Sequence, residues 1–263
     1  MHQTCGGLAF QSDKFSPPHA GNANRWVAEM NLPYKLHHGD CLPFMRSLES
    51  QSVDFTFYDP PYNVGKDYGV HKDSMSPEDY KQWMIDIASE ARRLSRHGFA
   101  VYVGSKLTKL FFEIIPDAHF IPVHKRAIGA MDGNYFLQYH SLFVVGKPII
   151  KCKDLWDDIR LPGEGYYFRE ERFDHPGQTA QALVKKVLYH FTVENDIVLD
   201  PFLGVGTSAV VALSMERQIV GCELSPVYFS IAESRVQAAV SQPVLFARNP
   251  TKRAGDKSQP SLI

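Results

Sequence analysis

The stretch IVLDPFLGVGTSAVVA, residues 197–212, decides the fold class of this chain. It begins in a β-branched run that predicts a strand over 196–200, and it ends in a segment that predicts a helix over 206–216. The loop between them carries Gly204 and Gly206, and glycines let a ligand approach the backbone closely. A strand, a glycine loop and a helix in this order are typical of a ligand site at the end of a parallel sheet.

An acidic residue follows this corner at the tip of the next predicted strand, 217–223. A carboxylate at Glu223 can accept hydrogen bonds from ribose hydroxyls, although it could also cap the helix predicted from residue 225. The pair Gly204 and Gly206 lacks the third glycine of the dinucleotide fingerprint, and no Gly-Lys-Ser/Thr follows as in a phosphate-binding loop. These features favour a nucleoside-bearing cofactor without a pyrophosphate, and S-adenosylmethionine fits that description.

Strands and helices alternate along most of the chain, which predicts a mainly parallel sheet with helices on both faces. We expect further strands over 34–40, 53–58 and 99–104, and paired strands within 118–128 and 135–147 around the turn MDGN. Helices are expected over 41–50, 76–95, 107–115, 179–192 and 225–240. Residues 1–33 are predicted to be an irregular arm, and 241–263 a mobile, basic tail.

A second motif, FTFYDPPYNVG at 55–65, ends a predicted strand with an acid, two prolines and an aromatic ring. The rigid prolines can direct the Asp59 carboxylate and the Pro60 carbonyl to one spot, where both accept hydrogen bonds. Tyr62 supplies a flat face on which a base can stack. The motif therefore predicts a receptor for the exocyclic amino group of a base, whose nitrogen lone pair can attack a sulfonium methyl group in line. A plain turn that ends the strand is the alternative.

Composition and charge exclude several classes of protein. The net charge is −1, so nucleic-acid contacts must come from local basic patches. None of the four cysteines forms a C-x-x-C pair, so we expect no metal site and free thiols in a reducing cytosol. No run approaches the about 18 apolar residues of a membrane span, and the N-terminus lacks the apolar core of a secretory signal. We expect a cytoplasmic protein with no membrane partner.

The segments DPPYNVG (59–65) and DPFLGVGTSAVVA (200–212) resemble motifs IV and I of the β-class S-adenosylmethionine-dependent DNA amino-methyltransferases. These enzymes modify adenine N6 or cytosine N4, and the catalytic motif here precedes the cofactor motif, as in the circularly permuted order of the β class. The resemblance covers about residues 34–240 and implies one catalytic domain with a Rossmann-like class I methyltransferase fold. That fold is an α/β fold with a seven-stranded, mostly parallel sheet and helices on both faces.

The resemblance also implies roles for individual residues. The catalytic residues would be Asp59, Pro60, Pro61 and Tyr62. HHGD followed by CLPFM is similar to the Gly-Asp segment of the family, and FDHPGQTAQALVKKVL (173–188) is similar to motif X. In motif X, Thr179 and Ala180 stand where the family usually has Lys-Pro. The cofactor-binding residues implied are Asp40, Cys41, His175, Gln178, Thr179, Asp200, Phe202, Gly204, Gly206, Thr207, Glu223 and Leu224.

By the same resemblance, the substrate is a base flipped out of double-stranded DNA. Asp-Pro-Pro-Tyr favours adenine N6 in a short specific sequence, with residues from about 107 to 172 as a target-recognition insertion. Cytosine N4, a protein amide, an RNA base and an inactive binding protein remain as alternatives. The resemblance leaves open a homodimer and a cognate restriction endonuclease as partners.

Overall fold

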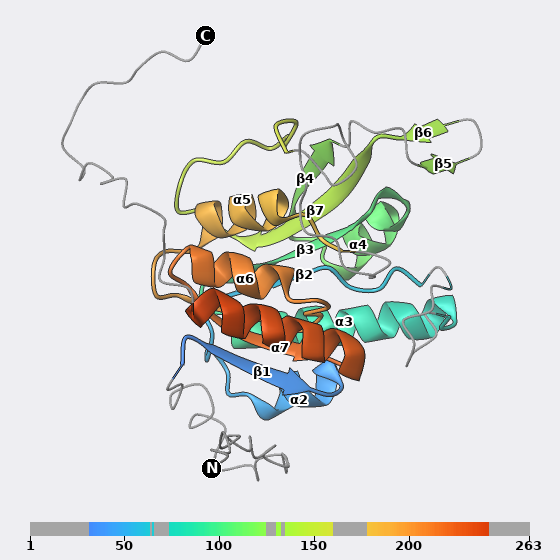
Figure 1. Cartoon of the computed structure of the whole chain (residues 1–263). Coiled ribbons are helices and arrows are strands. Elements are labelled where there is room, and N and C mark those ends of the chain that lie inside the picture. The colour runs from blue at the N-terminus through green and yellow to red at the C-terminus, as the bar shows by residue number, and fades with distance from the viewer. Residues whose placement is uncertain are drawn as a thin grey trace, which may run out of the picture.

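A computed structural model describes residues 32–63, 65, 74–124, 130–132, 135–159 and 178–241. Seven strands form one sheet in the order β1-β9-β8-β2-β3-β7-β4 (Figure 1). β7 is antiparallel to both of its neighbours, and the other pairs are parallel. The strands are β1 (Tyr34–His38), β2 (Phe55–Tyr58), β3 (Gly98–Gly104), β4 (His119–His124), β7 (Tyr139–Gly146), β8 (Ile197–Asp200) and β9 (Gln218–Glu223). The predicted α/β fold with a mostly parallel seven-stranded sheet is confirmed.

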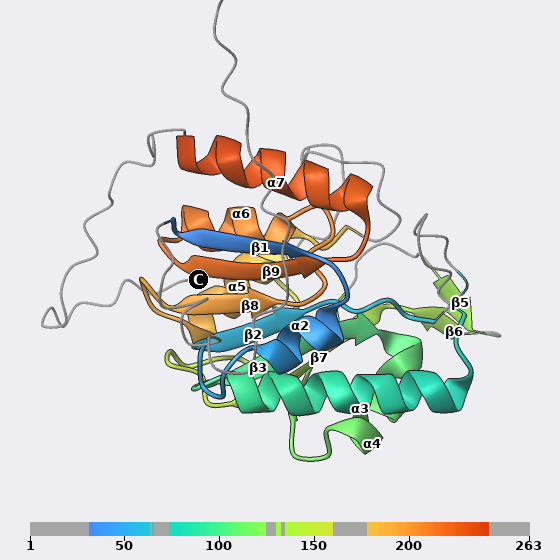
Figure 2. The ribbon, with the colours of Figure 1, turned by 90° about the horizontal axis from the view of Figure 1, so that it is seen from below.

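Helices cover both faces of the sheet, as Figure 2 shows from below. One face packs against α2 (Cys41–Ser47), α3 (Pro77–Leu94) and α4 (Thr108–Ile114), the last entered through the short 3-10 turn η1 (Ser105–Leu107). The other face packs against α5 (Gln181–Phe191), α6 (Thr207–Ser214) and α7 (Pro226–Ser241). Each face therefore has its own apolar cluster, and the sheet lies between them. No helix in the described ranges is long and apolar enough to cross a lipid bilayer.

The sequence of α3, the longest helix among the described residues, explains where it begins and which face it buries. Ser76 caps α3 by accepting a hydrogen bond from the backbone N–H of Asp79, and Pro77 occupies the first turn. Apolar residues then recur at helical spacing, and those buried are Tyr80, Met84, Ile87, Ala88, Ala91 and Leu94. The helix predicted over 76–95 thus forms almost as expected.

The sheet brings two distant motifs to one edge. In the parallel β2–β8 pair, Phe55 lies opposite Val198 and Thr56 lies opposite Leu199. The residues that follow each strand, from Asp59 and from Asp200, therefore leave the sheet at the same carboxyl edge. This is the edge at which open α/β sheets bind their ligands.

The insertion expected over about 107–172 needs a correction at its boundaries. β4 and β7 lie inside that range and are paired strands of the main sheet, so much of the range belongs to the core. The small hairpin of β5 (Ala130–Asp132) and β6 (Tyr135–Leu137) lies outside the main sheet, as do the described residues 147–159. Residues 160–177 are outside the described part of the chain.

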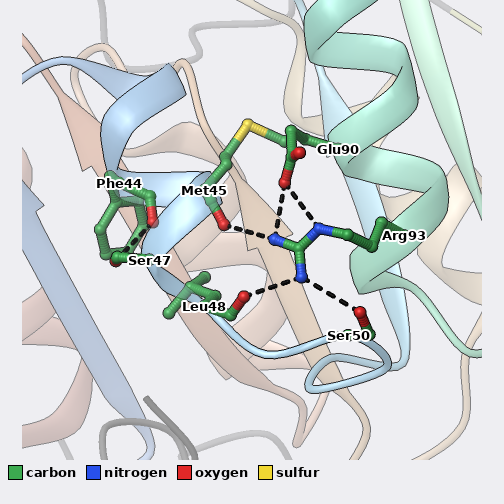
Figure 3. A network of polar contacts seen from close by, with 7 residues as sticks. All are labelled: Phe44, Met45, Ser47, Leu48, Ser50, Glu90 and Arg93. Carbon is green, nitrogen blue, oxygen red and sulfur yellow. Dashed lines mark hydrogen bonds and ion pairs between the residues drawn. The ribbon is translucent and has the colours of Figure 1, made fainter. Parts of the chain in front are cut away.

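One arginine ties α2 to α3. Arg93 donates to the carbonyl oxygens of Met45 (2.9 Å) and Leu48 (2.9 Å) at the end of α2, and to the carboxylate of Glu90 on its own helix (2.6 Å) (Figure 3). It also reaches the Ser50 hydroxyl at 3.2 Å. The Met45 carbonyl also accepts from the backbone N–H of Leu48 at 3.1 Å, so Arg93 adds a second donor there and supplies a donor to the Leu48 carbonyl.

We expect Arg93→Met to lower the free energy of unfolding by about 2 to 4 kcal/mol, because it leaves the Glu90 carboxylate without its ion pair and removes one donor from each of the two carbonyls. The matched control is Arg92→Met on the same helix. Arg92 pairs with Asp117, and the two side chains are 50% and 57% exposed, so its loss should cost no more than about 0.5 kcal/mol. Urea unfolding of both variants measures the difference, and equal costs would contradict the role assigned to Arg93.

Candidate active site

Three carboxylates come together at the carboxyl edge of the sheet. Asp200 ends β8, Glu223 ends β9, and Asp59 directly follows β2. β8 is paired in parallel with β2 on one side and with β9 on the other, so these three strand ends are neighbours. The predicted amine receptor and the predicted cofactor corner therefore lie at one site.

Aromatic packing joins the same two segments. The ring of Tyr58, the last residue of β2, lies 6.0 Å from the ring of Phe202. Trp83 of α3 meets Phe202 edge-on, with ring centroids 5.6 Å apart. Phe202 thus anchors the glycine loop against α3.

Asp200 is buried, and two donors hold its carboxylate. The backbone N–H of Phe202 donates at 2.9 Å, and the Ser208 hydroxyl of α6 donates to the other oxygen. Burial raises the pKa of Asp200 to about 7, since these hydrogen bonds only partly oppose the loss of solvation. Asp200 therefore holds the loop and the start of α6 in place.

Glu223 connects the glycine loop to the start of α7. Its two oxygens accept from the backbone N–H groups of Gly204 (2.8 Å) and Ser225 (2.7 Å), and burial raises its pKa. Gly204 has a φ of 54°, a left-handed conformation that aims its N–H at Glu223. Glu223 therefore binds a backbone N–H at the start of α7, as the alternative role of a helix cap predicts. Each carboxylate oxygen still has a second lone pair that can accept from a ligand hydroxyl.

The start of α6 presents a buried hydroxyl. Thr207 is 4% exposed, and its Oγ1 has no hydrogen-bond partner among the described residues. It follows Gly206, whose φ of 80° bends the chain into the helix. A buried hydroxyl of this kind is suited to a polar ligand group.

The end of β1 lies beside Glu223. The backbone N–H of Gly39 donates to the Glu223 carbonyl at 2.9 Å, and Asp40 caps α2 by accepting from the N–H of Leu42 at 3.0 Å. Cys41 is buried, and burial raises the pKa of its thiol. Leu224 is exposed, while His175 lies outside the described residues. Asp40 and Cys41 thus follow the strand that pairs with Glu223, and Leu224 follows Glu223 in the chain.

The Asp-Pro-Pro-Tyr segment is held by hydrogen bonds that its sequence did not predict. The Tyr62 hydroxyl donates to Asp59 Oδ1 at 2.8 Å, and the Thr179 hydroxyl donates to Asp59 Oδ2 at 2.7 Å. The Tyr80 hydroxyl of α3 donates to the Pro61 carbonyl at 2.8 Å. From the sequence, Tyr62 was predicted only to stack on the base. Thr179, which follows Gln178, was predicted to bind the cofactor.

Comparison with known proteins agrees with this arrangement. Residues 146–234 match the family model for N6/N4 DNA methylases. The DNA adenine methyltransferase YhdJ of Escherichia coli K12 is 22% identical over 241 residues, which cover 77% of this chain and 82% of that protein. These matches support an N6-adenine/N4-cytosine amino-methyltransferase.

Solved structures share the fold of this chain. TTHA0409 from Thermus thermophilus, crystallised with S-adenosyl-L-methionine, has a TM-score of 0.58 at 22% identity, covering 79% of this chain and 95% of that one. The cytosine-N4-specific PvuII DNA methyltransferase has a TM-score of 0.61 at 14% identity, covering 77% and 86%. Both likenesses concern the methyltransferase fold and do not separate the two target bases.

Proposed function

We propose that this methylase transfers a methyl group from S-adenosylmethionine to the N6 amino group of adenine in double-stranded DNA. The observation that supports the proposal is that Asp59, Asp200 and Glu223 lie at the ends of three adjacent parallel strands, where the rings of Tyr58 and Phe202 are 6.0 Å apart. One of these carboxylates belongs to the predicted amine receptor, and the other two belong to the predicted cofactor corner.

The residues present suit this cofactor. Glu223 is placed for ribose hydroxyls, with Asp40, Cys41 and Leu224 beside it for the adenine end. The unpartnered Thr207 hydroxyl, at the end of α6 that carries a partial positive charge, suits the negative part of a zwitterionic tail. The site is also rich in carboxylates, which favours a ligand with a positive charge. When bound, the cofactor supplies a methyl group on a positively charged sulfur.

The residues of the Asp-Pro-Pro-Tyr segment then act on the base. The Asp59 carboxylate and the Pro60 carbonyl accept the two amino N–H groups, so that the nitrogen lone pair is free to attack. Tyr62 stacks on the flipped base. Asp59 can also receive the proton that the amino nitrogen loses once it carries the methyl group, so positioning and electrostatics account for the chemistry.

Adenine is the favoured base because the motif begins with Asp rather than Ser, and YhdJ is named as an adenine enzyme. We assign recognition of the DNA sequence to the segments between β4 and α5 that lie outside the main sheet. We infer that the target base is flipped out of the duplex when the protein binds the DNA. Cytosine N4 is the second candidate, since the fold is shared with the PvuII enzyme. A homodimer and a cognate endonuclease remain predictions.

The deciding experiment is transfer of labelled methyl from S-adenosylmethionine to unmethylated double-stranded DNA, followed by digestion to nucleosides. We expect label in N6-methyladenine. Label in N4-methylcytosine would replace adenine by the second candidate, and absence of label in every DNA offered would overturn the proposal.

Gly204→Val should weaken cofactor binding first. A β-branched residue is strained at a φ of 54°, and the backbone N–H that holds Glu223 would move with it. We expect the cofactor dissociation constant to rise about ten- to a hundredfold by isothermal titration calorimetry. Unchanged affinity together with a loss of turnover would place Gly204 outside the cofactor site.

A further inference from the structure

A hydroxyl from a distant part of the chain holds the acid of the amine receptor. Thr179 and Asp59 are 120 residues apart, and Thr179 Oγ1 donates to Asp59 Oδ2 at 2.7 Å. The Tyr62 hydroxyl, three residues from Asp59, donates to the other oxygen at 2.8 Å. A carboxylate with a donor on each oxygen cannot turn about its Cβ–Cγ bond without losing both contacts.

The backbone beside Thr179 is fixed by the protein core. Ala180 is 3% exposed and is the N-cap of α5, and its carbonyl accepts from the N–H groups of Leu183 (3.1 Å) and Val184 (3.2 Å). Leu183 and Val184 are fully buried against the sheet. Thr179 therefore presents its hydroxyl from the start of a helix that cannot shift without opening the core.

Tyr62 is the donor that also has a proposed role toward the base. Its ring lies against Gly104 at the end of β3, where an added Cβ would come within 3.3 Å of the ring edge. If Tyr62 stacks on the flipped base, as proposed above, its hydroxyl must adjust to the base. Thr179 lies on a separate element and can keep its contact through that change.

We propose that Thr179 is a positioning residue for Asp59, and that it holds the carboxylate plane in the orientation that accepts the target amino group. This inference rests on the proposed function and changes the role predicted for Thr179 from the sequence, which was contact with the cofactor. Each carboxylate oxygen has two lone pairs, so Oδ2 can accept from Thr179 and from the base at once.

The test compares Thr179→Val, which keeps the shape and removes the hydroxyl, with Thr179→Ser, which keeps the hydroxyl. At saturating cofactor and DNA we expect kcat of Thr179→Val to fall about 10- to 100-fold, because a misplaced reacting group costs rates of that order. Thr179→Ser should recover most of the rate. The cofactor dissociation constant of both variants should stay within about twofold of wild type, which is under 0.5 kcal/mol.

Thr192→Val is the matched control. Thr192 lies at the other end of α5, and its hydroxyl donates to the Leu188 carbonyl and accepts from Arg217. The same loss of a hydroxyl there should lower the melting temperature and leave kcat unchanged. A fall in kcat for Thr179→Val but not for Thr192→Val separates positioning from a general weakening of α5.

Two results would overturn the inference and leave the proposed function standing. One is wild-type kcat in Thr179→Val while Asp59→Ala is inactive. The other is weaker cofactor binding with kcat unchanged, which would return Thr179 to the cofactor site. A wild-type protein that methylates no DNA would overturn the proposed function, and this inference with it.

Discussion

Asp59→Ala is expected to abolish methyl transfer to DNA, with kcat reduced at least about a thousandfold, while the protein still binds S-adenosylmethionine. The variant removes a charged acceptor aimed at the reacting amino group, and loss of one such group commonly costs two to three orders of magnitude. The Thr179 and Tyr62 hydroxyls that now donate to it would also lose their partner. Single-turnover kinetics with labelled cofactor measures the effect.

The binding measurement makes this result specific. Asp200 and Glu223 are held by their own backbone donors, so the cofactor corner should survive the change. Removing the Asp59 charge should also lower the pKa of Asp200, because that charge helps to raise it. Asp117→Ala, at an exposed carboxylate on the surface, is the control and should turn over normally. An Asp59→Ala enzyme as active as wild type would remove the amine receptor from the mechanism.

Gly98→Val is expected to prevent folding, with a loss of more than about 4 kcal/mol, which exceeds what most single substitutions cost. Gly98 begins β3 with a φ of 121° and pairs with Gly146 of β7 in the antiparallel register. A Cβ at Gly98 would lie 1.9 Å from the Val145 carbonyl oxygen, and one at Gly146 would lie 2.2 Å from the His97 carbonyl oxygen. Both obstacles are backbone atoms, so no side-chain movement can relieve them.

Gly221→Ala provides the contrast. A Cβ at Gly221 of β9 would also be close to a neighbour, 2.9 Å from the Leu203 side chain. That neighbour is the end of a flexible side chain, and we expect a cost nearer 1 kcal/mol, about that of mild overpacking. Thermal and urea unfolding of Gly98→Ala, Gly98→Val and Gly221→Ala should rank them in this way. If Gly98→Val has the same free energy of unfolding as wild type, the backbones of β3 and β7 do not approach each other as closely as described here.

Much of the fold is predictable from local patterns. Ser76 and Pro77 marked the start of α3, and apolar spacing marked its length. The glycine loop after Asp200 predicted the strand, turn and helix found there. The meeting of Asp59 with Asp200 was also predictable, because carboxyl ends of parallel strands share one edge of a sheet.

Other features depend on which distant segments pack together. The range 107–172 read as an insertion, yet β4 and β7 within it complete the main sheet, since strand order is not written in the strands themselves. The contacts of Arg93 likewise depend on α2 packing beside α3, and no local pattern in the sequence indicates them.

The amino-acid sequence by itself predicted most elements of this protein, the acid and aromatic ring of the proposed amine receptor, and the glycine loop beside them. Residues near one another in the chain carry those signals, through periodicity and turn chemistry. Only the tertiary structure decided that Thr179 donates to Asp59, because a hydrogen bond across 120 residues forms where a helix and a strand pack, and no local pattern records that contact.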